Sequence, residues 1–189
     1  MDSIERAQAL LAKRNKTIQK ESTHISQTID NSIYNTPIQL AQTHWSAFET
    51  PAHIQLINEH LLKLNDGDIK KLMIAMPPRH GKSEIISKYF LAWYIINNPD
   101  KRIIFVTYSF EFSSEFGLEV RDIVNELGHD ITIRQDMRTK NKFFIKDHRG
   151  QVSFTGIGGS ITGKGADLLV IDDPIKGAEQ ALVMVKERR

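Results

Sequence analysis

Met76-Pro77-Pro78-Arg79-His80-Gly81-Lys82-Ser83 stands between an apolar run at residues 72–75 and a segment with a helical pattern at residues 84–96. A strand, a loop and a helix in this order are the setting in which a phosphate-binding loop works. Backbone N–H groups at the start of a helix hold phosphate oxygens, because they lack intrahelical partners and lie at the positive end of the helix dipole. The sequence therefore predicts a phosphate-binding loop at residues 76–83.

Three residues at the end of this loop suit that chemistry. Gly81 lets the backbone approach a phosphate closely, Lys82 can reach the outer phosphates, and Ser83 offers a hydroxyl to Mg²⁺. The usual pattern has a further glycine at the position that Met76 occupies. A Gly-Lys-Ser tripeptide also occurs in loops that only cap a helix, and this alternative stays open for the loop by itself.

The composition is that of an ordinary globular protein. The 189 residues are 40% hydrophobic and 25% charged, and a formal net charge of +2 says little about partners. The lack of cysteine excludes disulfides and thiolate metal sites. The N-terminus has no apolar signal region, and no apolar run approaches roughly 18 residues, so we expect a cytoplasmic protein with no membrane partner.

Two parts of different character are expected along the chain. Residues 1–36 combine a helix with a narrow apolar stripe and a polar linker, so a domain boundary is predicted near Pro37, with residues 37–189 as the second domain. Its expected elements are helices at residues 50–67, 84–96 and 109–128, and strands at residues 72–75, 103–106, 142–146, 151–155 and 168–171.

Strands that alternate with helices predict an α/β fold with a mainly parallel sheet flanked by helices. Such sheets bind ligands at the carboxyl ends of their strands. Asp172 and Asp173 directly follow the last apolar run, so we expect them beside the loop. Asp172 would hold Mg²⁺ opposite Ser83, and Asp173 would orient and polarise the attacking water. The alternative is a strand that simply ends in an Asp-Asp-Pro turn.

Three motifs together resemble the phage terminase large subunit. They are Pro77-Pro78-Arg79-His80-Gly81-Lys82-Ser83, Gly158-Gly159-Ser160-Ile161-Thr162-Gly163-Lys164-Gly165-Ala166-Asp167 and Leu169-Val170-Ile171-Asp172-Asp173-Pro174-Ile175-Lys176. The resemblance runs from about Phe48 to the C-terminus, and it is to the ATPase half of that DNA-packaging motor.

The resemblance implies a P-loop NTPase of the additional-strand class. The resemblance further implies a Mg²⁺-dependent ATPase, with Walker A and Walker B motifs, that pumps double-stranded DNA into a capsid. The resemblance also implies self-association into a ring, a portal and a small terminase subunit as partners, and the cytoplasm of a bacterial host. Because the chain stops 16 residues after Asp173, the family's C-terminal nuclease domain and the motif that couples hydrolysis to movement are expected to be missing, in a fragment or a truncated prophage-derived gene.

The resemblance also assigns roles to individual residues. Arg79 resembles a basic residue that reads the γ-phosphate, and Lys164 resembles a finger that reaches a neighbouring subunit's nucleotide. Lys lacks the planar fork of Arg, and a solvated loop lysine is the alternative. The expected ATP-binding residues are Pro77, Pro78, Arg79, His80, Gly81, Lys82, Ser83, Phe48 and His53, the expected catalytic residues are Lys82, Asp173, Arg79 and Lys164, and the expected metal ligands are Ser83 and Asp172.

Trp45, Phe48, His53 and Gln55 precede the expected strand that leads into the loop, and the resemblance implies that the adenine pocket lies there. For the two aromatic residues, a place in the core is the alternative. Residues 134–149 contain six Lys or Arg and two Asp, which makes them a candidate DNA contact, although a solvated hairpin face is favoured.

Two other functions stay open on the sequence alone. A helicase-type P-loop enzyme is the nearest enzymatic alternative, but it would need further nucleic-acid motifs and a second domain, which are not found. A truncated prophage-derived remnant that binds nucleotide or DNA without turnover is the non-enzymatic alternative.

Overall fold

The computed structural model describes residues 34–136, 139–159 and 165–175. All that follows concerns the compact unit Thr36–Arg189. The helix and polar linker expected at residues 1–36 lie almost wholly outside the described residues, and so do Lys164 and the chain after Ile175.

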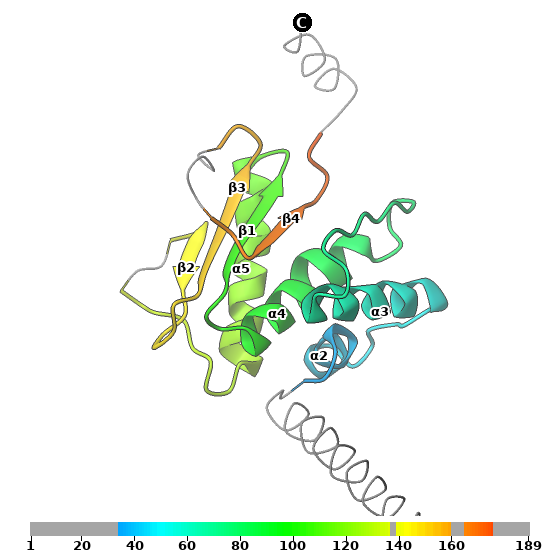
Figure 1. Cartoon of the computed structure of the whole chain (residues 1–189), viewed down its shortest axis with the longest axis horizontal. Coiled ribbons are helices and arrows are strands. Elements are labelled where there is room, and N and C mark those ends of the chain that lie inside the picture. The colour runs from blue at the N-terminus through cyan, green and yellow to red at the C-terminus, as the bar shows by residue number, and fades with distance from the viewer. Residues whose placement is uncertain (1–33, 137–138, 160–164, 176–189) are drawn as a thin grey trace, which may run out of the picture. The chain divides into compact units, whose positions relative to one another are not determined.

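Four helical elements precede the first strand of the described chain, and α5 separates that strand from the other three (Figure 1). In chain order, the elements are α2 (Pro37–His44), α3 (Ala52–Asp66), the π-helix η1 (Glu84–Phe90), α4 (Leu91–Asn97), β1 (Arg102–Thr107), α5 (Phe110–Leu127), β2 (Lys142–Phe144), β3 (Gln151–Gly156) and β4 (Leu168–Ile171).

The four strands form one mixed sheet in the order β2-β3-β1-β4. β1 is parallel to both β3 and β4, whereas β2 and β3 form the expected antiparallel hairpin. The prediction of an α/β fold with a mainly parallel sheet and flanking helices is therefore confirmed. The narrower assignment to the additional-strand class of P-loop NTPases stays a prediction.

The core lies where the middle strands meet the helices. Every residue of β1 after Arg102 is buried, as expected of a strand covered on both faces. Phe105 of β1 is paired with Phe154 of β3, and their ring centroids are 5.4 Å apart. α5 contacts both strands and follows Ser109, the first residue of the helix predicted at 109–128, whose hydroxyl caps α5 by accepting a hydrogen bond from Phe112 N–H (3.2 Å).

Residues 72–75 were expected to form the strand before the loop, and this prediction is wrong for the described structure. They are assigned to no strand, and Met73 is 95% exposed. A strand exists only through backbone hydrogen bonds to a neighbour, and within the described residues β4 is bonded to β1 alone. An apolar run of four residues indicates burial but does not provide the partner.

Three other expectations need correction. The apolar run at residues 168–171 favours a buried strand, but Leu169 and Ile171 are 54% and 56% exposed, because in the described part of the chain β4 lies at the edge of the sheet and one of its faces is open. The helix expected at residues 84–96 consists of a π-helical part, η1, and an α-helical part, α4. α3 begins at Ala52, two residues after the expected start at residue 50, and its N-cap Pro51 makes no side-chain hydrogen bond.

Candidate functional site

The end of β4 positions the two acids. The Asp172 N–H donates to the Val106 carbonyl of β1 (2.9 Å), so the parallel ladder continues through this residue. Asp173 follows with φ at 41°, in the left-handed region that short polar residues tolerate better than most. Asp172 is 6% exposed and the Asp173 side chain is 61% exposed. The strand end therefore presents one buried carboxylate and one that faces solvent.

The loop before η1 is held partly by two histidines. His80 Nδ1–H donates to the Pro78 carbonyl (2.8 Å), and His53 Nε2–H of α3 donates to the His80 carbonyl (3.1 Å). Because a carbonyl oxygen only accepts, these contacts determine which ring nitrogen of each histidine carries a proton. His53, one of the residues expected to bind ATP, therefore contacts the phosphate-binding loop directly.

Two loop residues have positive φ angles, 63° at Arg79 and 82° at Gly81. A Cβ atom at Gly81 would lie 3.2 Å from Ile54 Cδ1 of α3, so both the backbone conformation and the available space favour glycine here. For Arg79 the left-handed conformation costs about 1–2 kcal/mol. Strain of this kind concentrates at functional sites.

Backbone donors gather where the loop joins η1. Pro77 and Pro78 supply no N–H group, so the continuous run of donors in the loop begins at Arg79. The first helical hydrogen bond runs from Ile85 N–H to the Gly81 carbonyl (3.0 Å). The N–H groups of residues 82–84 precede it and belong to the set that a helix leaves without intrahelical partners. Such groups bind anions well.

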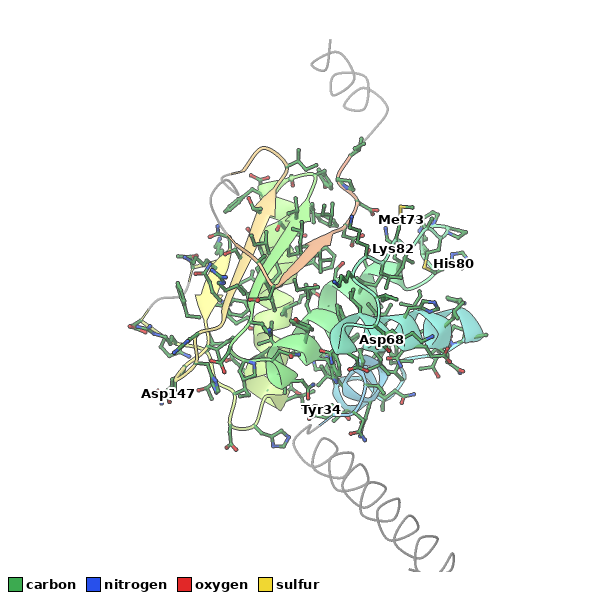
Figure 2. The ribbon with its side chains drawn as sticks, in the orientation of Figure 1. Tyr34, Asp68, Met73, His80, Lys82 and Asp147 are labelled. Carbon is green, nitrogen blue, oxygen red and sulfur yellow. The ribbon has the colours of Figure 1, made fainter. Side chains whose placement is uncertain are left out.

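Lys82 connects the loop to both acids. Its Nζ donates to Asp173 Oδ1 at 2.6 Å and lies 3.0 Å from Asp172 Oδ1. Figure 2 labels Lys82 near the end of β4, with Met73 and His80 on the loop side. The two motifs predicted to form one site are thus in direct contact across about 90 residues of sequence.

The environment of Lys82 favours its charged form. Burial lowers its pKa, but the hydrogen bonds to Asp173 and Asp172, with the negative charge of both carboxylates, outweigh burial and raise the pKa above the usual value. Lys82 is therefore a protonated ammonium group at neutral pH, able to contact carboxylate or phosphate oxygens.

The second oxygen of Asp172 has a partner that the sequence reasoning missed. Ser87 of η1 donates from Oγ to Asp172 Oδ2 at 2.6 Å, and both residues are buried. A signal was present, because Ser87 is a small polar residue within the apolar pattern of Ile85, Ile86, Tyr89 and Phe90. A buried hydroxyl in such a pattern needs an acceptor.

The predicted metal ligands suit Mg²⁺ by their chemistry. Asp172 and Ser83 offer a carboxylate and a hydroxyl oxygen, and Mg²⁺ in nucleotide sites is bound by one or two such groups together with phosphates and water. Ser83 is half-buried at the start of η1, directly after Lys82. Among the described residues, no group of three or more His, Asp and Glu side chains could hold a metal ion by itself.

A pocket of about 590 Å³ lies next to the loop. Its lining combines residues before the loop, among them Trp45, Phe48 and His53, with Arg79, His80 and Gly81 of the loop itself. Trp45 is 51% exposed, whereas Phe48 is buried with its ring centroid 5.2 Å from that of Tyr89. Phe48 is thus largely a core residue, and the indole of Trp45 is the aromatic surface that a ligand could contact.

Other predicted residues are less closely connected to the site. Gln55 does not line this pocket, and its side chain donates to the Thr50 carbonyl (2.8 Å). Arg79 is exposed, and within the described part of the chain its guanidinium has no ion pair. In the basic segment, Phe143 is buried and so offers no open ring to a DNA base, while Lys142 Nζ lies 4.6 Å from the centroid of the Phe144 ring.

Comparison with known proteins places the chain beside one family. The model of the family described as "Terminase large subunit, T4likevirus-type, N-terminal" matches residues 73–184, more than half of the chain. The match includes the loop, the sheet and both acids. No curated protein matches the chain significantly. None of the helices in the described segments is long and apolar enough to cross a membrane.

Proposed function

Because this chain belongs to the terminase large-subunit family, in its T4likevirus-type N-terminal form, we propose that it is an ATP-hydrolysing motor domain for packaging double-stranded DNA. The family implies a role in phage DNA packaging. The ATPase activity is our inference, and the observation that carries it is the contact of Lys82 with both Asp172 and Asp173.

The loop supplies the phosphate-binding groups in this proposal. The N–H groups at the start of η1 and the ammonium of Lys82 would hold the phosphates, and the guanidinium of Arg79 would contact the γ-phosphate. The backbone strain at Arg79 and the open backbone at Gly81 support a loop shaped for close approach of a ligand.

Lys82 has to exchange partners when phosphate binds. Its ammonium contacts both carboxylates, and a phosphate group would compete with them for the same donor. Release of Asp173 from Lys82 would leave a solvent-facing carboxylate free to accept a hydrogen bond from water. Phosphate binding would thereby prepare the group that acts on the attacking water.

The two acids have different environments and would have different roles. Asp172 is buried and fixed at the strand end, which suits a ligand of Mg²⁺, together with Ser83. Bound there, Mg²⁺ would neutralise the negative charge that develops on the phosphate oxygens. Asp173 is exposed and would orient and polarise the water.

The base would occupy the pocket beside the loop. The exposed indole of Trp45 offers a stacking surface, and the His53 ring stands next to His80 with centroids 6.1 Å apart. Double-stranded DNA, copies of this chain in a ring, a portal and a small terminase subunit would be the partners, in the cytoplasm of a bacterial host.

The test is Mg²⁺-dependent ATP hydrolysis by this chain, measured with and without double-stranded DNA. Asp173→Asn tolerates the positive φ, and we expect it to lower turnover by roughly 10²–10⁴-fold while nucleotide still binds. Asp122→Asn, at an exposed acid of α5, is the matched control and should hydrolyse as the wild type does. Wild-type turnover in Asp173→Asn would disprove the catalytic assignment, and binding without turnover in the wild type would favour the non-enzymatic alternative.

A further inference from the structure

We propose that Ser87 is a positioning residue, which fixes the orientation of the Asp172 carboxylate for metal binding. This inference rests on the proposed function, because it concerns the same Mg²⁺ site. It adds a residue that lies outside the phosphate-binding loop and the acidic motif.

The two oxygens of Asp172 have separate partners. Oδ2 accepts the hydrogen bond from Ser87 Oγ at 2.6 Å, while Oδ1 lies 3.0 Å from Lys82 Nζ. A rotation of the carboxylate by about 90° around its Cβ–Cγ bond, where its torsion is soft, would break both contacts. Ser87 therefore fixes the plane of the carboxylate, so that the oxygen not bound to Ser87 faces the side of the loop where the phosphates would bind.

The hydrogen bond itself is of a strong kind. A carboxylate oxygen can only accept, so Ser87 must be the donor, and an O–H to carboxylate bond at this distance is assisted by charge. Ser87 is completely buried and Asp172 nearly so, which leaves little room for water to replace a lost donor.

Ion pairs and buried side chains hold η1, the helix that carries Ser87, in place. On this helix, Lys88 Nζ lies 2.9 Å from Glu84 Oε1 and 3.3 Å from Glu119 Oε2, and the second pair joins η1 to α5. Ile85 and Tyr89 on either side of Ser87 are buried. Lys82 and Ser83 immediately precede η1, so the position of this helix sets the position of the end of the loop. Through Ser87, the same helix also orients the Asp172 carboxylate.

If Ser87 only stabilised the fold, its loss would lower stability and leave the metal affinity of the folded protein unchanged. Metal affinity is therefore measured separately from turnover and from stability. The probe is Mn²⁺, titrated by electron paramagnetic resonance into protein saturated with ADP. Loss of a group that orients a metal ligand typically weakens metal binding by about 10–100-fold, and we expect that loss for Ser87→Ala. Ser87→Thr keeps the hydroxyl, so it should retain most of the affinity even where its extra methyl lowers the melting temperature.

Ser114→Ala is the matched control, because Ser114 is also buried and donates its hydroxyl hydrogen bond to a carbonyl, that of Phe110. It should lose stability without losing Mn²⁺ affinity. If Ser87→Ala does not fold, Ser87→Cys offers a weak donor of similar size and should show a smaller loss of the same kind.

Wild-type Mn²⁺ affinity in Ser87→Ala, or an equal loss in Ser114→Ala, would overturn the role of Ser87 and leave the nucleotide site standing. If the wild type bound no Mn²⁺ with ADP, the proposed function would fail, and the role of Ser87 with it.

Discussion

Lys82 Nζ donates a hydrogen bond to Asp173 Oδ1 at 2.6 Å, although the two residues stand 91 positions apart in the sequence. One residue ends the loop and the other follows β4, so this bond joins the two motifs on which the proposed function depends. The bond also has consequences for stability that need no ligand to test.

The contribution of Lys82 to stability should depend on pH in one direction. The pKa of Lys82 is raised above its ordinary value of 10.5, because its bonds to the carboxylates outweigh burial. A raised pKa in the folded state means that the stabilisation is fully present below the unfolded pKa and is lost as pH rises through the folded value. The difference in unfolding free energy between the wild type and Lys82→Met should therefore be constant near neutral pH and shrink above about pH 10.5. Chemical denaturation across this range measures it, and a difference that grows with pH would contradict the assignment.

Arg79→Gly should stabilise the protein relative to Arg79→Ala. At φ of 63° both Arg and Ala are strained, whereas glycine adopts this conformation freely. We expect Arg79→Gly to be more stable than Arg79→Ala by about 1 kcal/mol, as measured by the denaturant midpoint. Both variants lack the guanidinium and should lose ATP turnover alike. Equal stability of the two would show that the loop does not hold position 79 in the left-handed region in solution.

Trp45 should report nucleotide binding by its fluorescence. The chain has two tryptophans, and Trp45 is 51% exposed at the pocket beside the loop, whereas Trp93 is 3% exposed and stacked on Phe90. Stacking of a base on Trp45 changes its surroundings while Trp93 stays in the core. Addition of ATP should alter wild-type emission, and Trp45→Phe should remove the change. A change that persists in Trp45→Phe would place the base elsewhere.

The open face of β4 should promote association between molecules. Leu169 and Ile171 expose apolar side chains on an edge strand, and such edges pair readily with other chains. Leu169→Lys should raise the concentration at which light scattering detects association and change stability by no more than about 0.5 kcal/mol. Leu56→Lys, at an equally exposed leucine of α3, is the control. The same effect in both variants would mean that general surface hydrophobicity, rather than β4, drives the association.

Periodicity and capping residues predicted much of the fold. The continuous apolar run at Ile103–Val106 gave a strand buried on both faces, and Ser109 caps α5 as expected. Gly67 ends α3 in the left-handed conformation, at the end predicted for that helix. A strand's burial pattern, a helix cap and a helix end each depend on a few neighbouring residues, so the local sequence is enough to predict them.

Features that depend on distant partners were not predictable in this way. Residues 72–75 have a strand-like composition but no hydrogen-bonded neighbour in the described structure, and the open face of β4 depends on its place at the edge. The Ser87–Asp172 bond joins residues 85 apart and depends on how η1 packs against the sheet. Sequence reasoning did place Lys82 with Asp172 and Asp173, because the carboxyl end of a parallel strand was the expected position for both motifs.

The most direct test is the equilibrium binding of Mg²⁺-ATP by isothermal titration calorimetry, with wild type and Lys82→Ala compared. Lys63→Ala, at an exposed lysine of α3, is the matched control. We predict saturable binding by the wild type and by Lys63→Ala, and a loss of roughly 100-fold in affinity for Lys82→Ala, since one charge-assisted bond to phosphate disappears. Equal affinity of Lys82→Ala and the wild type would contradict the claim that residues 76–83 form a nucleotide site, and so would an absence of binding by all three proteins.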